Sequence, residues 1–404
     1  MILSNKQRTK NTVMSMKIGI ISEFNLNTVN FGNHLQAYAL NVYLRKEPDV
    51  SEVDSIALCG KQMGKHTNLF SIAFLQKAAG KLWGKLIKEK ETTVAQFDKT
   101  LFRSRLAHFE EFRSRDSSWS IKEMSSQDLL QSDYDALIVG SDVVWSQYPL
   151  WISRTKFLDF SSQKPFKRIS YAASFGNDYI PKENIKHIRK YLSKFDAISV
   201  REHSSVAMLS SVGVNNAAYC LDPTLLLTAE QWEKIERKPE IKVDTDGYIF
   251  VYLLGDDAAQ RQRIAEFACQ KNLKIVTIPN ANGYRISADE DFGDIQLADC
   301  SVENWIWLIH HAEYIFTDSF HGTVFSTVFE KRFWVLKRTG SVNINNRMQD
   351  YLQEIAQQDK WIGAENLKNA DRFLWDYRQI NGAIEERKTN SVAFLRAALK
   401  SVGH

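Results

Sequence analysis

The sequence predicts a doubly wound α/β fold with parallel sheets and crossover helices. From Lys17 onward, short runs rich in β-branched and aromatic residues alternate with longer stretches of helical periodicity. A charged stretch with few apolar residues, 233–247, divides these runs into two series. The 404 residues, 44% of them hydrophobic, suffice for two domains with a substantial core and exclude a largely disordered chain.

Each apolar run is expected to form one strand. The first series comprises residues 17–22, 135–139, 168–171, 197–200 and 217–221, and the second comprises residues 248–254, 274–278, 314–317 and 333–336. We therefore predict an N-terminal Rossmann-like domain at residues 16–235 and a C-terminal Rossmann-like domain at residues 236–370. The polar helical pattern of residues 371–404 predicts a helical segment that packs back on the first domain.

The charge and the cysteine content restrict the classes of function and the cellular location that we expect for this chain. With 52 Lys and Arg against 48 Asp and Glu, the net charge of +4 is too small to indicate a dedicated nucleic-acid-binding protein. The four cysteines lack metal-ligand spacing, which is typical of reduced thiols in a cytoplasmic protein. We expect neither a signal peptide nor a transmembrane span, because no apolar run reaches about 18 residues and the N-terminus lacks an apolar segment.

The positive charge is concentrated in residues 71–90, which contain five Lys and one Glu. Leu75, Leu82 and Leu86 fall on one face of a helix there, and lysines flank that face. One interpretation is an amphipathic helix that packs on the sheet. The other is a helix that lies on an anionic membrane, which would attach the protein peripherally to the inner membrane, where a lipid-linked saccharide would be its substrate.

Polar residues follow several predicted strands, at the sheet edge where ligands bind in open α/β folds. After the first strand, Gly32 permits a tight turn and Asn33 can cap the helix predicted at 33–45. Together with Asn30, these residues would form a nest of backbone amides for an anion or a sugar. A plain capped turn explains the same residues.

Two further strand ends carry charged residues. Asp142 follows the strand at 135–139 and has Trp145 nearby, a combination that suits sugar recognition, although tryptophan more often packs in a core. Arg201 follows the strand at 197–200 and lies beside the N-terminus of the helix predicted at 202–211, which suits a phosphate or a carboxylate. An exposed ion pair with Glu202 is the alternative.

The segment Thr317-Asp-Ser-Phe-His-Gly322 lies between a predicted strand and a helix predicted at 323–330. Asp318 or Ser319 can cap this helix, and Gly322 lets a ligand approach the backbone. His321 would then lie beside amide donors that bind an anion, where it could give a proton to that anion. A structural histidine is the alternative.

Several known motifs are missing from the chain. It contains no Walker A sequence, no G-x-G-x-x-G and no H-E-x-x-H, and Asp291-Phe-Gly293 stands without the other kinase signatures. The adjacent His310 and His311 have no partner at metal-ligand spacing in the sequence. We therefore expect no bound metal and no cofactor.

A set of motifs, taken in order, resembles the polysaccharide pyruvyltransferase family. They extend over residues 17–352 and are 30–33 with 35–40, 140–145, 170–176, 199–202, 221–224, 317–322 and 346–347. The resemblance implies a glycosyltransferase-B-like protein in which two Rossmann-like domains face a cleft. It also implies transfer of the pyruvyl group of phosphoenolpyruvate to two hydroxyls of a saccharide, as a cyclic ketal with release of phosphate, in the synthesis of bacterial surface polysaccharide.

The same resemblance implies that Arg201 binds phosphoenolpyruvate and that His321 is catalytic. We assign Asp142 to orient or deprotonate a hydroxyl. The other residues assigned to substrate binding are Asn30, Gly32, Asn33, Trp145, Ser319, Phe320, Gly322 and Arg347.

In one respect the chain departs from the family pattern. Some members carry Arg two residues before the histidine, where this chain has Ser319. The missing charge would come from Arg347, Lys337 or Arg338. Two other functions stay open at this point: a nucleotide-sugar-dependent glycosyltransferase and a non-catalytic, glycan-binding relative.

Overall fold

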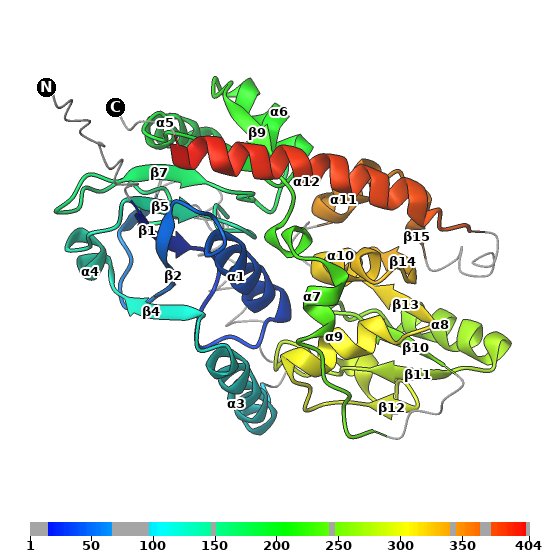
Figure 1. The fold of residues 1–404 in the computed structure, drawn as a ribbon. Helices are drawn as coiled ribbons and strands as arrows, with labels where there is room; N and C mark the ends of the chain where they lie inside the picture. The colour runs from blue at the N-terminus through cyan, green and yellow to red at the C-terminus, as the bar shows by residue number, and fades with distance from the viewer. Residues whose placement is uncertain are drawn as a thin grey trace, which may run out of the picture.

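The computed structural model describes residues 15–66, 97–146, 151–241, 247–339, 345–363 and 373–400. Two parallel sheets with crossover helices make up most of the molecule (Figure 1). All the strands expected from the apolar runs are present, so the predicted α/β class is confirmed. Residues 71–90, for which a membrane helix was considered, lie outside the described residues. Among the described helices, none is long and apolar enough to cross a bilayer.

The first sheet has the strand order β4-β2-β1-β5-β7, and every neighbouring pair is parallel. Its strands are β1 (Met16–Ile21), β2 (Val50–Leu58), β4 (Ser120–Met124), β5 (Ala136–Val139) and β7 (Lys167–Ser170). Numbered along the chain this order is 3-2-1-4-5, so the direction of winding reverses between β1 and β5.

The sequence did not predict β2 and β4, since both carry charged residues. Asp54 on β2 is buried, and its carboxylate accepts hydrogen bonds from Lys122 and Ser120 of β4 and from the Tyr134 hydroxyl. A buried carboxylate needs such partners, and here they come from the neighbouring strand. Pairing between strands therefore explains a polar pattern that resembles a loop in the sequence.

Helices and short strands complete the first half. Helix α1 begins at Phe31, and its cap is Asn30, whose side chain accepts from the Asn33 amide, so the expectation that Asn33 caps this helix is wrong. The other elements are β3 (Gly64–His66), α3 (Lys99–Arg115), α4 (Ser126–Leu130), β6 (Trp151–Ser153), α5 (Lys182–Leu192), β8 (Ile198–Val200), α6 (His203–Ser211), β9 (Ala217–Tyr219), η1 (Pro223–Leu226) and α7 (Ala229–Glu233). The parallel pair of β8 and β9 lies beside β7.

The second sheet has the strand order β12-β11-β10-β13-β14-β15 and is also parallel, with the reversal between β10 and β13. Its strands are β10 (Tyr248–Tyr252), β11 (Lys274–Thr277), β12 (Ile295–Gln296), β13 (Tyr314–Thr317), β14 (Arg332–Leu336) and β15 (Trp361–Ile362). Its helices are α8 (Ala258–Lys271), η2 (Ser287–Asp289), α9 (Val302–His310), α10 (Phe320–Val328), α11 (Asn346–Glu354) and η3 (Gln358–Lys360). Helix α10 begins three residues before the predicted start, so His321 lies inside its first turn.

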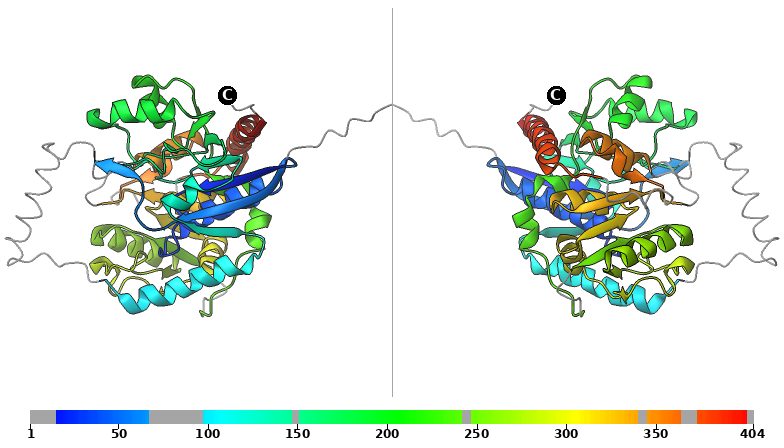
Figure 2. Two further views of the ribbon diagram at one scale, coloured as in Figure 1. Left: turned by 90° about the vertical axis from the view of Figure 1, so that its left-hand side faces the viewer. Right: turned by 90° about the vertical axis from the view of Figure 1, so that its right-hand side faces the viewer.

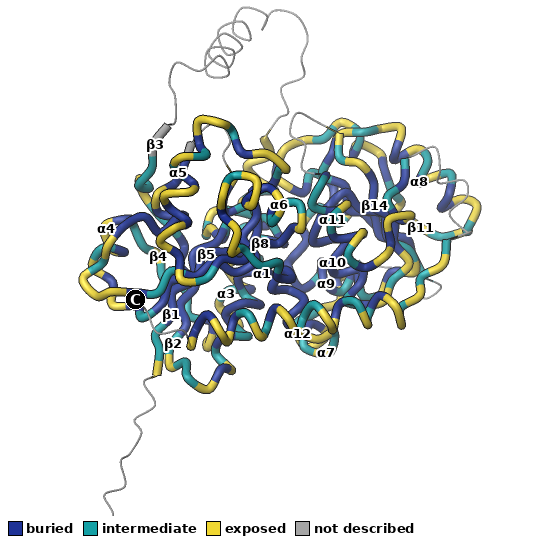
Figure 3. The backbone as a smooth tube through the Cα atoms, turned by 90° about the horizontal axis from the view of Figure 1, so that it is seen from above, coloured by how far each residue is buried: buried dark blue, intermediate teal, exposed yellow. Residues whose placement is uncertain are grey.

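The two halves share one large apolar cluster, and buried backbone runs through both of them (Figure 3). Phe31 at the start of α1 stacks on Trp305 of α9, with 5.5 Å between ring centroids. The long helix α12 (Tyr377–Lys400) lies along both halves (Figure 1), and the two views of Figure 2 look nearly along its axis. Its Ile380 belongs to the shared cluster, whereas Leu395 packs with Ile18 of β1.

A buried arginine also joins α3 to the second half. The Arg105 guanidinium donates to the carbonyls of Ala298, Asn280 and Pro279 at 2.6, 2.6 and 2.7 Å. These carbonyls lie in the loops that follow β11 and β12, so α3 is held to the second sheet by directed bonds as well as by apolar contact.

Replacing Arg105 with leucine should lower the free energy of unfolding by about 3 kcal/mol, because buried carbonyls lose their donor and each costs ~1–3 kcal/mol. Urea denaturation followed by circular dichroism measures this change. Arg103→Leu on the exposed face of the same helix is the matched control and should change stability by less than ~0.5 kcal/mol. An equal loss of unfolding free energy in both variants would contradict the conclusion that these hydrogen bonds hold α3 to the second sheet.

Candidate active site

One cavity lies where the switch points of the two sheets face each other. Where strand order reverses, the loops after the two central strands diverge and leave a crevice for a ligand. Most of the lining residues lie at or after the ends of β1, β5, β10, β13 and β14, and the others belong to α9 and α11. They are Asn30, Gly32, Asp142, Tyr252, Leu254, Trp305, Ser319, Phe320, His321, Arg338 and Arg347. The empty space of the cavity, including its open mouth, is about 410 Å³.

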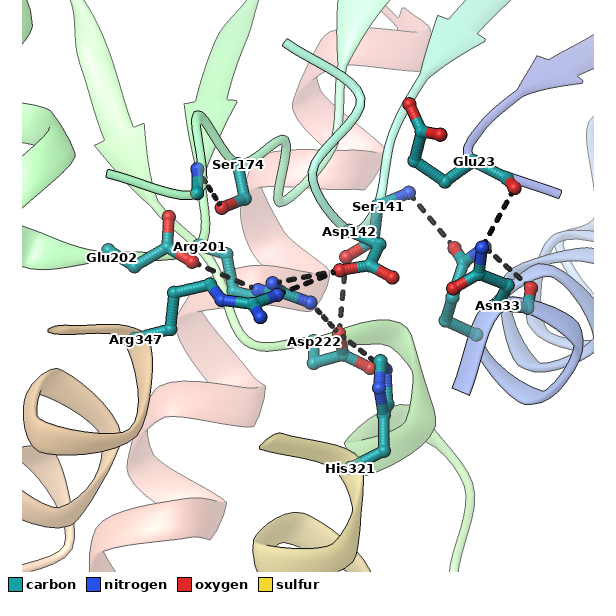
Figure 4. Close-up of polar contacts among 12 residues, drawn as sticks. Glu23, Asn33, Ser141, Asp142, Ser174, Arg201, Glu202, Asp222, His321 and Arg347 are labelled. Carbon is teal, nitrogen blue, oxygen red and sulfur yellow. Dashed lines mark hydrogen bonds and ion pairs between the residues drawn. The ribbon is translucent and has the colours of Figure 1, made fainter. Parts of the chain in front are cut away.

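His321 is held at the N-terminus of α10. Ser319 caps this helix, and its Oγ accepts from the Gly322 amide at 3.3 Å. The helix therefore begins at the cavity, and its amide groups and dipole favour an anion there. The His321 side chain is 8% exposed, and its Nε2 lies 3.5 Å from Oδ2 of Asp222 (Figure 4).

Gly32 allows His321 to approach α1. A Cβ atom on Gly32 would overlap the His321 ring, so an alanine could not be accommodated without moving the ring or one of the two helices. The role predicted for Gly32 was a tight turn. The structure shows that its lack of a side chain instead lets the first turn of α1 contact the imidazole from the other half.

Asp222 is the main residue of the site that the sequence analysis did not assign. Its Oδ2 accepts from Arg201 at 2.8 Å and from the Ser141 hydroxyl at 3.2 Å, and its Oδ1 accepts from Thr224. Burial would raise the pKa of Asp222, but the charges of His321 and Arg201 hold it far below the ordinary range. A fixed negative charge therefore lies beside the imidazole. The signal was available, because Asp222 directly follows the strand predicted at 217–221.

Arg201 lies behind the cavity lining and holds three carboxylates. Its guanidinium donates to Asp222, to Asp142 at 3.2 Å and to Glu202 at 3.1 Å, and one face lies on the Phe320 ring, 4.1 Å from the centroid. Burial alone would lower the pKa of Arg201, yet the three carboxylates raise it well above its usual value. The side chain is 1% exposed, so it positions the site and does not line the cavity.

Asp142 and Arg347 form the part of this network that reaches the cavity. Asp142 has a left-handed backbone (φ 62°), and its Oδ1 accepts from both Arg201 and Arg347, the latter at 3.1 Å. Burial opposes ionisation, but Arg201, His321 and Arg347 keep the pKa of Asp142 low. Burial lowers the pKa of Arg347 to about 10, and the Asp142 carboxylate opposes this shift. An anion bound beside the guanidinium would favour its charged form further.

Asp318 ties the loop after β10 to the start of α10. Its carboxylate accepts from the amides of Leu254 and Gly255, both at 2.8 Å. Arg338 donates to the Asp318 carbonyl at 2.7 Å and lines the cavity from the end of β14. Two arginines of the second half, Arg338 and Arg347, therefore border the same space as His321.

The remaining predicted site residues have other positions. Asn33 lies further along α1 and donates to the Glu23 carbonyl at 3.0 Å. Gly322 packs against Thr317, where a Cβ atom would overlap its hydroxyl, so close packing rather than ligand access explains this glycine. Trp145 is 1% exposed and stacks on Phe157, with centroids 5.1 Å apart. The predicted sugar stacking on Trp145 is wrong, since its ring belongs to the core.

The donor groups of the cavity suit an anion better than a metal ion. Of the lining residues in the described ranges, Asp142 is the one with a carboxylate, and two arginines already bind it. A hard divalent cation needs several oxygen ligands.

Comparison with known proteins supports this assignment. The family model for polysaccharide pyruvyl transferase matches residues 30–339. The chain belongs to this family. In this pyruvyl transferase family member, the matched range contains all of the residues that line the cavity except Arg347. No curated protein matches the chain in a sequence search.

Solved structures with the same fold include nucleotide-sugar enzymes. MnaA from S. aureus, in a co-structure with UDP, is 11% identical with a TM-score of 0.50 over 96% of this chain and 98% of its own. A UDP-N-acetylglucosamine 2-epimerase from Listeria monocytogenes, so described from its 2.2 Å structure, is 10% identical with a TM-score of 0.51 over 96% and 98%. This similarity confirms the glycosyltransferase-B-like fold and concerns the fold alone.

Gly32→Ala should lower the free energy of unfolding by about 1–3 kcal/mol, because the added methyl group overpacks the contact with His321. Chemical denaturation measures this loss. Gly382→Ala is the matched control: Gly382 is exposed on α12 with open space around it, and alanine should stabilise the helix by ~0.5–1 kcal/mol. A stabilised Gly32→Ala variant would contradict the close approach of the two helices.

Asp222→Asn should destabilise the protein by about 3–5 kcal/mol at neutral pH, because Arg201 loses a buried counter-charge. The depressed pKa means that the contribution of Asp222 is complete above the ordinary carboxyl pKa of about 3.9 and is lost as pH falls further. The difference in the free energy of unfolding between variant and wild type should therefore become smaller below about pH 4. Urea denaturation across this range tests it, with exposed Asp178→Asn as control. A difference in unfolding free energy that does not change with pH would contradict the assignment of Asp222 as an ionised partner of Arg201.

Proposed function

We propose that this protein transfers the pyruvyl group of phosphoenolpyruvate to two hydroxyls of a saccharide, with formation of a cyclic ketal and release of phosphate. The observation that carries the proposal is the position of His321. It lies beside Asp222 at a helix N-terminus, in a cavity bordered by Arg338 and Arg347, in a member of the polysaccharide pyruvyl transferase family.

The donor would bind through its two anionic groups. Phosphate and carboxylate are matched by guanidinium groups and by the amides at a helix N-terminus. Arg338 and Arg347 supply the charge that Ser319 lacks, whereas Lys337 is exposed and does not line the cavity. Arg201 holds Asp142 and Asp222 in place, and a direct contact with the donor would require one of these carboxylates to release it.

His321 is the proposed general acid. Its protonated imidazole, with Nε2 3.5 Å from the Asp222 carboxylate, gives a proton to the methylene carbon of phosphoenolpyruvate. The double bond becomes a methyl group beside an oxocarbenium-like carbon, which a first saccharide hydroxyl attacks. That hydroxyl returns its proton to the now neutral His321, and the acid is regenerated.

A second hydroxyl then completes the ketal. It attacks the same carbon, the bond to the phosphate oxygen breaks, and the hydroxyl proton leaves with the phosphate. Asp142 is a weak base because its arginine partners keep its pKa low, so it suits orientation of a hydroxyl as a hydrogen-bond acceptor. The arginines carry the positive charge that the reaction needs, and we propose that no metal or cofactor takes part.

The acceptor is proposed to be a saccharide of a bacterial surface polysaccharide. Asn30, Gly32 and Asp142 line the cavity from the first half, whereas Arg338 and Arg347 line it from the second. Whether the acceptor is lipid-linked depends on the membrane hypothesis for residues 71–90, which rests on the sequence pattern. Attachment to the inner membrane from the cytoplasmic side stays a prediction on the same ground.

The test is to incubate the protein with phosphoenolpyruvate and a panel of saccharides. We expect phosphate release together with an acceptor that gains a pyruvyl group minus water in mass spectrometry. His321→Gln should lower turnover by about 10²–10⁴-fold without loss of folding, because it cannot donate the proton. His187→Gln on α5, away from the cavity, is the matched control and should keep wild-type turnover.

Other outcomes would overturn the proposal. Release of a nucleotide from sugar nucleotides, without phosphate release from phosphoenolpyruvate, indicates a glycosyltransferase. A His321→Gln variant that retains the biological activity of the wild type indicates a non-catalytic, glycan-binding protein.

A further inference from the structure

Outside the candidate active site, two histidines and a glutamate converge at the end of α9. His310 is the last residue of α9, and His311 caps it. Glu236 comes from the segment after α7 and lies between them: its Oε2 is 2.9 Å from Nδ1 of His310, and its Oε1 is 3.0 Å from Nε2 of His311. The sequence shows no partner at metal-ligand spacing from the two histidines, and the fold brings Glu236 to them.

We propose that Glu236, His310 and His311 form a binding site for a divalent transition-metal ion, best suited to zinc, that joins the segment after α7 to the end of α9. Imidazole and carboxylate groups are the ligands that zinc takes in three-residue sites, with water in the fourth position. Magnesium and calcium are disfavoured, because they require mostly oxygen ligands.

The distances suit such an ion. Bonds of about 2.0–2.1 Å at tetrahedral angles place ligand atoms roughly 3.3 Å apart. One nitrogen of each histidine and one carboxylate oxygen of Glu236 all lie within 4.8 Å of one another, so small side-chain rotations suffice. In the structure each imidazole is bonded to one carboxylate oxygen, and the metal would replace the protons in these two hydrogen bonds.

Packing holds both imidazoles in place. His310 stacks on Phe329, with 4.4 Å between centroids, and His311 stacks on Trp307 at 4.5 Å. The Glu236 amide donates to the Trp232 carbonyl, which fixes the glutamate relative to α7. The site is therefore assembled before any ion binds, so these side chains lose less conformational entropy when the ion binds.

A second carboxylate supports the assignment of ligand atoms. Oε1 of Glu233 lies 3.9 Å from Nε2 of His310, the ring nitrogen that does not face Glu236. A metal-bound histidine usually donates its other ring N–H to a carboxylate, which fixes the tautomer and strengthens the ligand. Glu233 is 43% exposed in its side chain and can close this gap.

The surroundings also limit the strength of the site. The side chains of His310 and His311 are 26% and 41% exposed, so a water ligand and an ion have access. The ammonium of Lys331 interacts electrostatically with Glu236 and adds a positive charge that disfavours a cation. We therefore expect reversible binding, weaker than in a four-cysteine zinc site.

Titration of the tag-free, metal-stripped chain with Zn²⁺ by calorimetry should give one ion per chain. At roughly 100 times the dissociation constant, Zn²⁺ should raise Tm on the order of 5 °C, because the ion binds the native state only. Co²⁺ should give the intense visible absorption of a four-coordinate ion. Glu236→Gln and His311→Ala should each abolish the Tm shift while their unfolding in chelator matches that of the wild type.

His108→Ala is the matched control, since His108 forms a similar histidine–carboxylate pair with Asp299 at 3.2 Å but has no second histidine beside it. It should keep both the stoichiometry and the Tm shift. No Zn²⁺ binding by the wild type, or binding that survives Glu236→Gln and His311→Ala together, would overturn the proposal. The pyruvyl transfer proposed above does not depend on either result.

Discussion

The Arg201 guanidinium is the charge around which the site is assembled. It is almost fully buried and is bonded to Asp142, Asp222 and Glu202, which come from the ends of β5, β9 and β8. An uncompensated charge at such depth costs several kcal/mol, so these strand ends must meet at one place for the first half to be stable. The positions of the carboxylates then determine where the other charged groups can lie.

Two consequences follow for the cavity. Asp222 faces His321, so a negative charge lies 3.5 Å from Nε2 of the imidazole. Asp142 faces Arg347, and its carboxylate accepts hydrogen bonds from both Arg347 and Arg201. The structure therefore holds its positive groups in fixed positions before an anionic donor arrives, which is the arrangement that lowers the cost of charge development in a reaction.

The connection between the halves is equally specific. Gly32 lets α1 contact the histidine of α10, and Phe31 beside it stacks on Trp305. Neighbouring residues of one helix turn thus provide both the apolar contact between the halves and the close approach at the site. A change in the relative position of the halves would separate His321 from Asp222, because these residues belong to different halves.

Much of the fold could be predicted from apolar runs, since strands buried on both faces are continuous in Val, Ile and Leu. The strands β2 and β4 could not be predicted in this way. Their charged residues Asp54 and Lys122 form an ion pair across the sheet, and neither charge indicates a strand by itself. The rule that ligands bind beyond strand ends selected Asp142, Arg201 and His321. It was not applied to Asp222.

The sequence by itself determined the α/β class, the two series of strands and the strand ends that carry charged groups, because these follow from local patterns of apolar and polar residues. Only the tertiary structure decided which of these groups meet. Trp145 is buried in the core. Arg201 lies behind the cavity, whereas Arg338 and Arg347 border it. Glu236 lies against His310 and His311. Such contacts depend on residues far apart in the chain, and burial and charge compensation select among them only once the chain is folded.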